Sequence, residues 1–331
     1  MSQDIALPPV TNTDQGDERR NGIEIELNGL TLDRLAEVAA AELNLKIKQT
    51  GRYERKLVGD DAGDWVVEVD FRLLKEMGQK QRDNGDLADD VAVFAEDTLS
   101  RLADHVVPLE LVSPPLPMSR MTEVNKLVQV LRDKGAQGTS ARAINAFGLQ
   151  FNPEVPSTEP DSIVRYLKAF LCLEEWLIQH SEVNLTRKFT SYVSPFPKSY
   201  IKKVIAARYQ PSQREMIDDY IDDNPTRNRS LDCLPLFMHL DEDHVRARCS
   251  DPLIKSRPTF HYRLPNCEIH VPDWGIHLAW QDWLQVEQLA NDKDRLHACC
   301  KAYQRFLNNP LKCWFGNWEK QLKQEWLLTN D

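Results

Sequence analysis

The chain has 331 residues, 41% of them apolar and 28% charged, which is the balance of a globular protein with a sizeable core. Its net charge of -10 excludes a protein built for sequence-independent binding of a nucleic-acid backbone, and no apolar run is long enough to span a membrane. The seven cysteines are odd in number and form no C-x-x-C pair, so neither a disulfide framework nor a structural zinc site is expected, and a reducing cytoplasm fits best.

The first 20 residues are polar, contain the pair Pro8–Pro9 and lack the pattern of a secretory signal, so we expect a flexible tail over residues 1–20. From Asn21, NGIEIELNG alternates strictly between apolar and polar residues, which is typical of a half-buried strand. Thr31 is placed to cap a helix over LDRLAEVAAAEL. The other elements expected in the first half are short strands within 45–58, a strand over 65–71, a helix over 89–105, a strand in HVVPLELVSPP, a helix from Ser119 or Thr122 to about Lys134, and a strand in SARAINAFGLQFNPEVP.

The second half is mainly helical in its pattern. IVRYLKAFLCLEEWLIQH is long and amphipathic, and RPTFHYRLP is a late strand. Further helices are expected near 199–208, 212–222, 277–291 and 294–307. This order predicts an α+β fold in which sheet and helices share one core, rather than a doubly wound fold. We therefore expect one domain over 21–331, sheet-rich over 21–155 and helix-rich over 156–331, with a returning strand near 257–264.

Four of the expected strands carry oxygen-bearing side chains opposite an apolar face: Glu24 and Glu26, Glu68 and Asp70, Glu110, and Gln150 and Asn152. For any one strand, the simplest interpretation is the solvent face of an antiparallel sheet. Taken together, a face that gathers Glu24, Glu26 and Glu110 would repel itself unless a cation or solvent lay among the carboxylates. Carboxylate and amide oxygens are the hard ligands that magnesium prefers, so the pattern favours a magnesium site.

Three segments, NGIEIEL, ELVSPPL and GLQFNPEV, occur here in the order and at the separation found in the putative amidoligase family, which the chain resembles. NPTRNRSLDCLPLF (224–237) is similar to the family's central stretch, and RPTFHYR (257–263) to its late arginine strand. The resemblance covers roughly residues 21–270. It implies a fold and chemistry like those of glutamine synthetase and glutamate–cysteine ligase, with an antiparallel sheet that carries the active site and packs against helices.

The resemblance also implies roles for individual residues. Glu24, Glu26 and Glu110 would hold magnesium ions, or manganese, that bridge the phosphates of ATP. Gln150 and Asn152 would complete the metal site at positions where the family usually has histidines. The catalytic residues would be Asp70, near the amine or a second metal, and Arg257 and Arg263, which would stabilise the transferred phosphoryl group.

The expected reaction joins a carboxylate to an amine through an acyl phosphate, with an amino acid or peptide as the carboxylate substrate. Arg227 could bind a phosphate or a substrate carboxylate, or could equally form ion pairs with the acids at 218–223. A protein partner or a homo-oligomer is possible, and no nucleic acid or membrane partner is expected.

Three positions depart from the family pattern. Gln150 stands where a histidine is usual, His261 stands where an acidic residue is expected two before the arginine, and Arg72 stands where a small hydroxyl residue is expected. These departures leave open a degenerate protein that binds nucleotide, or serves as a scaffold, without turnover. Because clustered carboxylates also serve metal-dependent phosphohydrolases, that class is a third alternative.

Overall fold

The computed structural model describes residues 4–70, 108–141, 148–181, 194–309, 311 and 316–328. Within these ranges, nine strands form one antiparallel sheet in the order β2-β3-β4-β5-β1-β7-β9-β8, and β6 pairs with β1. The strands are β1 (Arg20–Leu27), β2 (Lys46–Gln49), β3 (Glu54–Val58), β4 (Trp65–Val69), β5 (Leu109–Val112), β6 (Leu116–Pro117), β7 (Leu149–Pro153), β8 (Leu231–Asp232) and β9 (His261–Tyr262). The predicted α+β class is confirmed, and β1 lies at the centre of the sheet.

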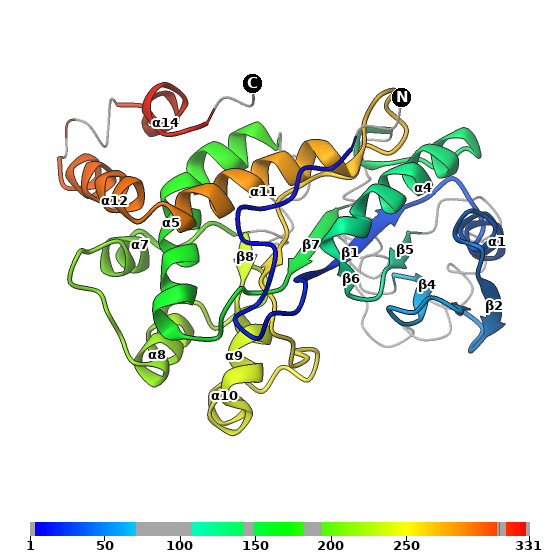
Figure 1. Ribbon diagram of the computed structural model, residues 1–331, viewed down its shortest axis with the longest axis horizontal. Helices are drawn as coiled ribbons and strands as arrows, with labels where there is room; N and C mark the ends of the chain where they lie inside the picture. The colour runs from blue at the N-terminus through cyan, green and yellow to red at the C-terminus, as the bar shows by residue number, and fades with distance from the viewer. Residues whose placement is uncertain are drawn as a thin grey trace, which may run out of the picture.

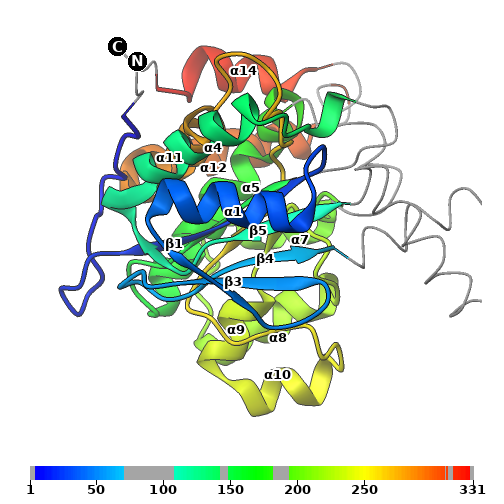
Figure 2. The same cartoon turned by 90° about the vertical axis from the view of Figure 1, so that its right-hand side faces the viewer.

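Four helices cover one face of this sheet, as Figures 1 and 2 show: α1 (Leu32–Leu43), α4 (Met121–Asp133), α5 (Pro160–His180) and α11 (Ile276–Asn291). Outside this layer the described helices are α7 (Lys198–Val204), α8 (Gln213–Asp223), α9 (Leu234–Leu240), α10 (Glu242–Arg248), α12 (Lys293–Leu307) and α14 (Trp318–Glu325). In both views α9 and α10 lie on the opposite side of the sheet from α11. No described helix is long and apolar enough to cross a membrane.

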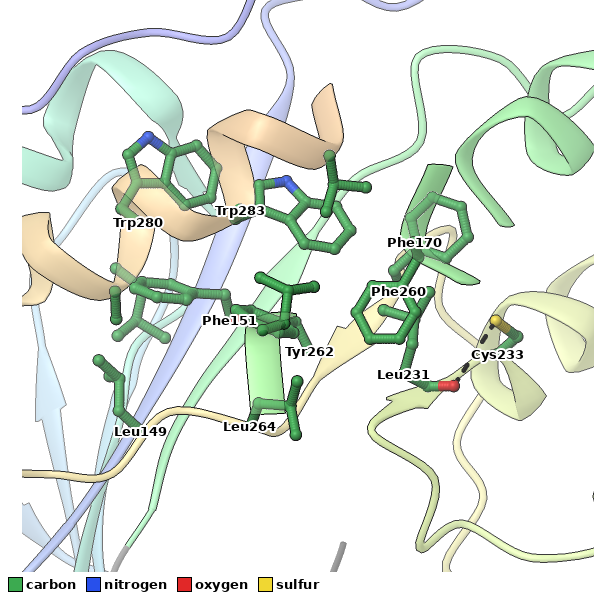
Figure 3. Close-up of a cluster of buried hydrophobic side chains, with 14 of the residues drawn as sticks. Leu149, Phe151, Phe170, Leu231, Cys233, Phe260, Tyr262, Leu264, Trp280 and Trp283 are labelled. Atoms are coloured by element: carbon green, nitrogen blue, oxygen red, sulfur yellow. Dashed lines mark hydrogen bonds between the residues drawn. The ribbon is translucent and has the colours of Figure 1, made fainter. Parts of the chain in front are cut away.

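The core lies between the sheet and the helical layer, because the central strands direct their apolar residues to that side. Ile23, Ile25 and Leu27 of β1 are buried on this face. Further along the sheet, the ring of Tyr262 in β9 lies 5.4 Å from Trp283 of α11. Figure 3 shows these rings packed between sheet and helix, with Trp280 beside Phe151. Both tryptophans of α11 are therefore part of the core.

The expectation of a flexible tail over residues 1–20 is wrong for the described residues 4–20. Arg19 is fully buried and forms an ion pair of 2.8 Å with Glu287 of α11. Trp280 Nε1 donates to the carbonyl oxygen of Ala6 at 2.8 Å. A polar composition did not reveal these contacts, because they join the segment to a helix more than 250 residues away in the sequence.

Local sequence signals placed several elements correctly. Thr31 accepts a hydrogen bond from the Arg34 amide at 3.1 Å and starts α1 as predicted. The late strand is shorter than expected, since only His261–Tyr262 of residues 257–265 pairs in regular fashion. The helices α9 and α10 were not predicted. The expected helix over 89–105 lies outside the described residues.

Candidate active site

The two glutamates of β1 lie on the sheet face opposite the core. Glu26 is 1% exposed, and its Oε2 accepts a hydrogen bond from the Gly148 amide at 2.6 Å. Glu24 Oε1 accepts a hydrogen bond of 2.7 Å from Asn152 Nδ2 on β7. Both carboxylates are therefore fixed by donors from the neighbouring strand β7 or its start.

Ser113, in the ELVSPPL segment, secures β5 against β1. Its Oγ accepts a hydrogen bond of 2.9 Å from the Ile23 amide, and its amide donates to the Ile23 carbonyl oxygen at 2.9 Å. The Ser113 hydroxyl in turn donates to the carbonyl oxygen of Pro114 at 2.8 Å. The Ser113 hydroxyl thus accepts from the buried Ile23 amide at the point where the regular pairing of β5 with β1 ends, so that amide is not left unsatisfied. This contact holds the strand that carries Glu24 and Glu26 in register.

A row of four glutamates crosses four neighbouring strands on the same face. The register places Glu26 opposite Glu110, Glu110 opposite Glu68, and Glu68 opposite Glu54. Residues directly opposite in an antiparallel pair have Cβ atoms about 5 Å apart, and like charges at such positions are destabilising. The row is therefore an arrangement that the fold maintains at a cost in stability.

The electrostatics of the row follow from this crowding. Burial raises the pKa of Glu110 well above its usual range, and the charges of Glu24 and Glu26 raise it further. Burial also raises the pKa of Glu68, as do Glu54 and Asp70. A carboxyl group in this state favours either a proton or a bound cation.

Strand β7 supplies amide oxygens beside the carboxylates. Gln150 lies opposite Glu24, and Asn152 lies opposite Gly22. Gln150 Oε1 and Asn152 Oδ1 are buried and have no hydrogen-bond partner among the described residues. A Cβ at position 22 would already contact the Asn152 side chain at 3.4 Å, so the glycine leaves room for the amide. Two hard oxygens thus remain available on the side of the face next to Glu24.

The opposite end of the polar face is cationic. Because Phe151 pairs with Tyr262, the antiparallel register sets Arg263 beside Gln150. Arg257 Nη1 lies 3.7 Å from Glu24 Oε1, and its side chain is 40% exposed. Arg227 pairs with Asp251 at 2.9 Å, not with the acids at 218–223. Guanidinium groups at this end suit a phosphate or carboxylate ligand.

His261 occupies the position where the resemblance implies an acidic residue. Burial lowers its pKa well below the usual range, and Arg263, Arg257 and Arg227 lower it further. Its Nε2 is buried and has no hydrogen-bond partner among the described residues. A neutral imidazole therefore replaces a carboxylate at this point of the face.

Asp232 is a site residue that the sequence reasoning missed. It lies opposite His261 in the pair formed by β8 and β9, is fully buried, and forms an ion pair of 3.4 Å with Arg263 Nη2. Burial raises its pKa to about 6, against the lowering effect of Arg263. The signal was present in NPTRNRSLDCLPLF, where Asp232 alternates with Leu231 and Cys233, but the strand is only two residues long.

The predicted metal residues meet on one face, but they do not form a complete metal cage. Among the described residues, no three side chains of histidine, cysteine, aspartate or glutamate are grouped closely enough to hold a metal ion. One physical reason is that Glu24 and Glu26 are already bonded to Asn152 and Gly148. Magnesium accepts amide oxygens and water as well as carboxylates, so the free oxygens of β7 and the raised pKa of Glu110 fit such an ion.

Asp70 follows β4 at the edge of this face and is 9% exposed. Its amide donates to the Pro108 carbonyl oxygen at 3.0 Å, which places it beside the start of β5. Arg72 lies outside the described residues. Of the residues predicted for the site, the acids and amides of β1, β4, β5 and β7 are thus brought together with Arg257 and Arg263, whereas Arg227 is paired with Asp251.

A family model described as putative amidoligase enzyme matches residues 17–285. The chain belongs to this amidoligase family. No curated protein and no solved structure matches it. The resemblance inferred from the sequence is confirmed, and the protein is by family an enzyme of the ligase type. The specific likeness to glutamine synthetase stays a prediction.

The amidoligase match contains the whole polar face, from Glu24 on β1 to Arg263 after β9. It ends within α11, so α12 and α14 lie outside it. Within the match, the ELVSPPL segment acts through Ser113 on the position of β1. That contact gives a physical reason for the segment's place in the amidoligase pattern, since it determines where two of the carboxylates lie.

Proposed function

We propose that this amidoligase joins a carboxylate to an amine in a reaction that consumes Mg–ATP and proceeds through an acyl phosphate. The observation that carries the proposal is the glutamate row on one sheet face, with free amide oxygens and arginines beside it. A face of this kind gains stability when a cation neutralises it, and the arginines offer an anion-binding end next to the cation.

In this proposal Glu24, Glu26 and Glu110 hold the magnesium ions, and Gln150 and Asn152 contribute amide oxygens. When bound, the metal and nucleotide supply charge neutralisation and an activated phosphoryl group. Phosphorylation is needed because hydroxide is a poor leaving group and a free carboxylate does not react with an amine. An amino acid or a peptide terminus is the carboxylate that we expect.

The remaining residues act by position and charge. Arg257 is partly exposed and lies 3.7 Å from Glu24, so it can reach an anion held at the acidic end without losing a buried partner. Asp232 forms an ion pair with Arg263, whose place in the register is beside Gln150, so this contact restrains the guanidinium on the polar face. Asp70 lies at the acidic edge, where it could accept a proton from the incoming amine. Phosphoryl transfer depends mainly on such positioning and charge neutralisation.

The test is ADP release by the full chain with Mg–ATP and a panel of amino acids and amines, with product analysis by mass spectrometry. The proposal expects ADP formation that requires both a carboxylate and an amine. Arg257→Ala should lower turnover about 10³-fold if the arginine stabilises the transferred group. Arg34→Ala, on the exposed face of α1, is the matched control and should not change it. ADP release that needs no amine would indicate a phosphohydrolase and contradict the ligase.

His261 supports a second candidate, a nucleotide-binding protein without turnover. A neutral, buried histidine at the position of an expected carboxylate offers a nitrogen in place of the charged oxygen ligand that magnesium prefers. Calorimetry separates the two functions. Binding of Mg–ATP without ADP formation in any substrate mixture would favour the second candidate. A His261→Glu variant that gains turnover would show that this position is the cause.

A further inference from the structure

Two thiols meet in the helical part of the molecule, away from the polar sheet face. Cys172 of α5 and Cys300 of α12 have their Sγ atoms 3.7 Å apart. Cys172 is completely buried, and Cys300 is 5% exposed. Cys300 lies beyond the range matched by the amidoligase model, so the pair joins the family domain to a helix that follows it.

Cys300 has a route to solvent through a cavity of about 470 Å³, which it lines together with Lys168 of α5. The other charged or ionisable side chains around this cavity are Asp161, Arg165, Lys293, His297 and Lys301. In a chain with a net charge of -10, a cavity with four lysine or arginine side chains and one aspartate is a local reversal of charge. Such surroundings favour an anionic form of the thiol.

Lys168 is held close to the thiols. It precedes Cys172 by one helical turn, and its Nζ donates to the carbonyl oxygens of Ala206 at 3.5 Å and Tyr209 at 3.2 Å. Burial lowers the pKa of Lys168, and the charges of Cys300 and Asp161 oppose that effect. The ammonium group is therefore held against the segment 206–209, at the wall of the cavity that Cys300 also lines.

The two sulfurs are electrostatically different. The contact with Cys172 lowers the pKa of Cys300, and Lys168 lowers it as well. Burial raises the pKa of Cys172 well above its usual range, and its contacts with Cys299 and Cys300 raise it further. Cys300 thus has the properties of an attacking thiolate, and Cys172 those of a protonated thiol that waits beside it.

We propose that Cys300 and Cys172 are a peroxide-oxidisable pair that closes to a disulfide between α12 and α5, with Lys168 favouring the reactive thiolate. The Cys300 thiolate attacks the peroxide, an S–O bond forms, the O–O bond breaks, and the released hydroxide takes a proton and leaves as water. Cys172 then attacks the sulfenic sulfur, the S–S bond forms, the S–O bond breaks, and the hydroxyl leaves with the thiol proton as a second water. Two thiols are oxidised by two electrons in total, and one peroxide is reduced.

The geometry requires a small movement. An S–S bond is about 2.05 Å long, so the sulfurs must approach by less than about 2 Å, which is within the reach of side-chain rotation and a slight shift of two packed helices. Cys299 also contacts Cys172, but it is completely buried and does not line the cavity. Access therefore selects Cys300 as the first sulfur to react.

The experiment uses the full chain, treated with one equivalent of hydrogen peroxide, blocked with N-ethylmaleimide and digested with trypsin without reduction. We expect a cross-link between the peptides 169–187 and 296–301 whose mass is two hydrogens below their sum, plus one N-ethylmaleimide on the remaining thiol of the second peptide. Because the second peptide contains both Cys299 and Cys300, the Cys299→Ser variant is needed to assign the bond, and it should keep the cross-link. Loss of the cross-link in Cys299→Ser with retention in Cys300→Ser would overturn the proposal. Absence of the cross-link from the peroxide-treated wild-type chain would overturn it as well.

The role of Lys168 is tested by the rate of cross-link formation. Lys168→Met should slow it about tenfold, since loss of the neighbouring cation raises the pKa of the Cys300 thiol and so lowers the fraction of reactive thiolate. Lys301→Met is the matched control, because Lys301 lines the same cavity but lies next to Cys300 on the exposed side of α12. Equal rates in the two variants would contradict the assigned role. Neither outcome depends on ligase activity, so this test is independent of the proposed function.

Discussion

Replacement of Arg19 by methionine should be one of the most destabilising single changes in this protein. The Arg19 guanidinium donates to both oxygens of Glu287, at 2.8 and 3.1 Å, and both side chains are completely buried. It also donates to the carbonyl oxygens of Val10 and Glu154, at 2.7 and 2.8 Å. Methionine fills much of the same volume but provides none of these donors.

The expected loss of unfolding free energy follows from the Glu287 charge that the substitution leaves unpaired. Removal of one partner from a buried ion pair typically costs about 3–5 kcal/mol of unfolding free energy, because the other charge stays buried. Glu287 would keep hydrogen bonds from Tyr166 at 2.6 Å and Trp283 at 2.9 Å, which places the expected loss near about 3 kcal/mol. The double variant Arg19→Met with Glu287→Gln should cost less than the sum of the two single changes, since no buried charge is left unpaired.

Urea unfolding of the wild type, both single variants and the double variant forms a double-mutant cycle, which gives the cost of each substitution and the coupling free energy between Arg19 and Glu287. The expected coupling free energy is at least about 2 kcal/mol. Asp33→Asn, which breaks a partly exposed pair with Arg55, is a control expected to cost below about 1 kcal/mol. A loss under about 1 kcal/mol for Arg19→Met would refute the view that residues 4–20 are an integral part of the fold.

Three further predictions concern hydrogen bonding and charge. Ser113→Ala leaves the buried Ile23 amide without its acceptor and should cost about 1–3 kcal/mol in urea unfolding; an unchanged midpoint would contradict this. Burial raises the pKa of Glu174 to about 7, so the folded state binds more protons than the unfolded state and wild-type stability should fall as pH rises from about 4.5 to 7. Glu174→Gln should flatten that dependence of Tm on pH. If the Tm of the variant and of the wild type changed with pH in parallel, Glu174 would not be the group responsible. Asp232→Asn releases Arg263 and should lower ligase turnover by about 10²-fold, whereas Asp251→Asn, which releases Arg227, is the control and should have a much smaller effect.

The polar sheet face could be predicted because alternation along a strand is a local property. Once each strand was assigned, the side on which Glu24, Glu110 and Gln150 lie followed from the period of two. Their order across the sheet did not follow, because pairing joins residues that are distant in the sequence. The opposition of Glu26 and Glu110, on which the electrostatic argument depends, came only from the structure.

Other features had no local signal. Asp232 lies in a two-residue strand, which is too short for a periodic pattern. The residues before Arg19 are mostly polar and show no periodic pattern, and its partner Glu287 lies in a helix that is distant in the sequence. The helix α9 was missed because LPLFMHL is a short apolar run that fits a strand as well as a helix, and its neighbour α10 begins only through the cap at Asp241.

If the glutamate row binds magnesium, loss of one of its carboxylates should weaken metal binding without lowering the stability of the metal-free protein. Glu110→Gln removes a carboxylate whose pKa is raised by burial and by Glu24 and Glu26, so the variant should be as stable as the wild type or more stable without magnesium. Glu54→Gln, in the same row but on the outer strand β3, is the matched control and should leave metal binding unchanged.

Isothermal titration calorimetry of the wild type and both variants with a non-hydrolysable Mg–ATP analogue is the most direct measurement. We expect binding by the wild type and Glu54→Gln, and affinity weakened at least about tenfold in Glu110→Gln although its Tm is undiminished. Equal affinity in all three proteins, or no binding to the wild type, would contradict the claim that this face is a magnesium–nucleotide site.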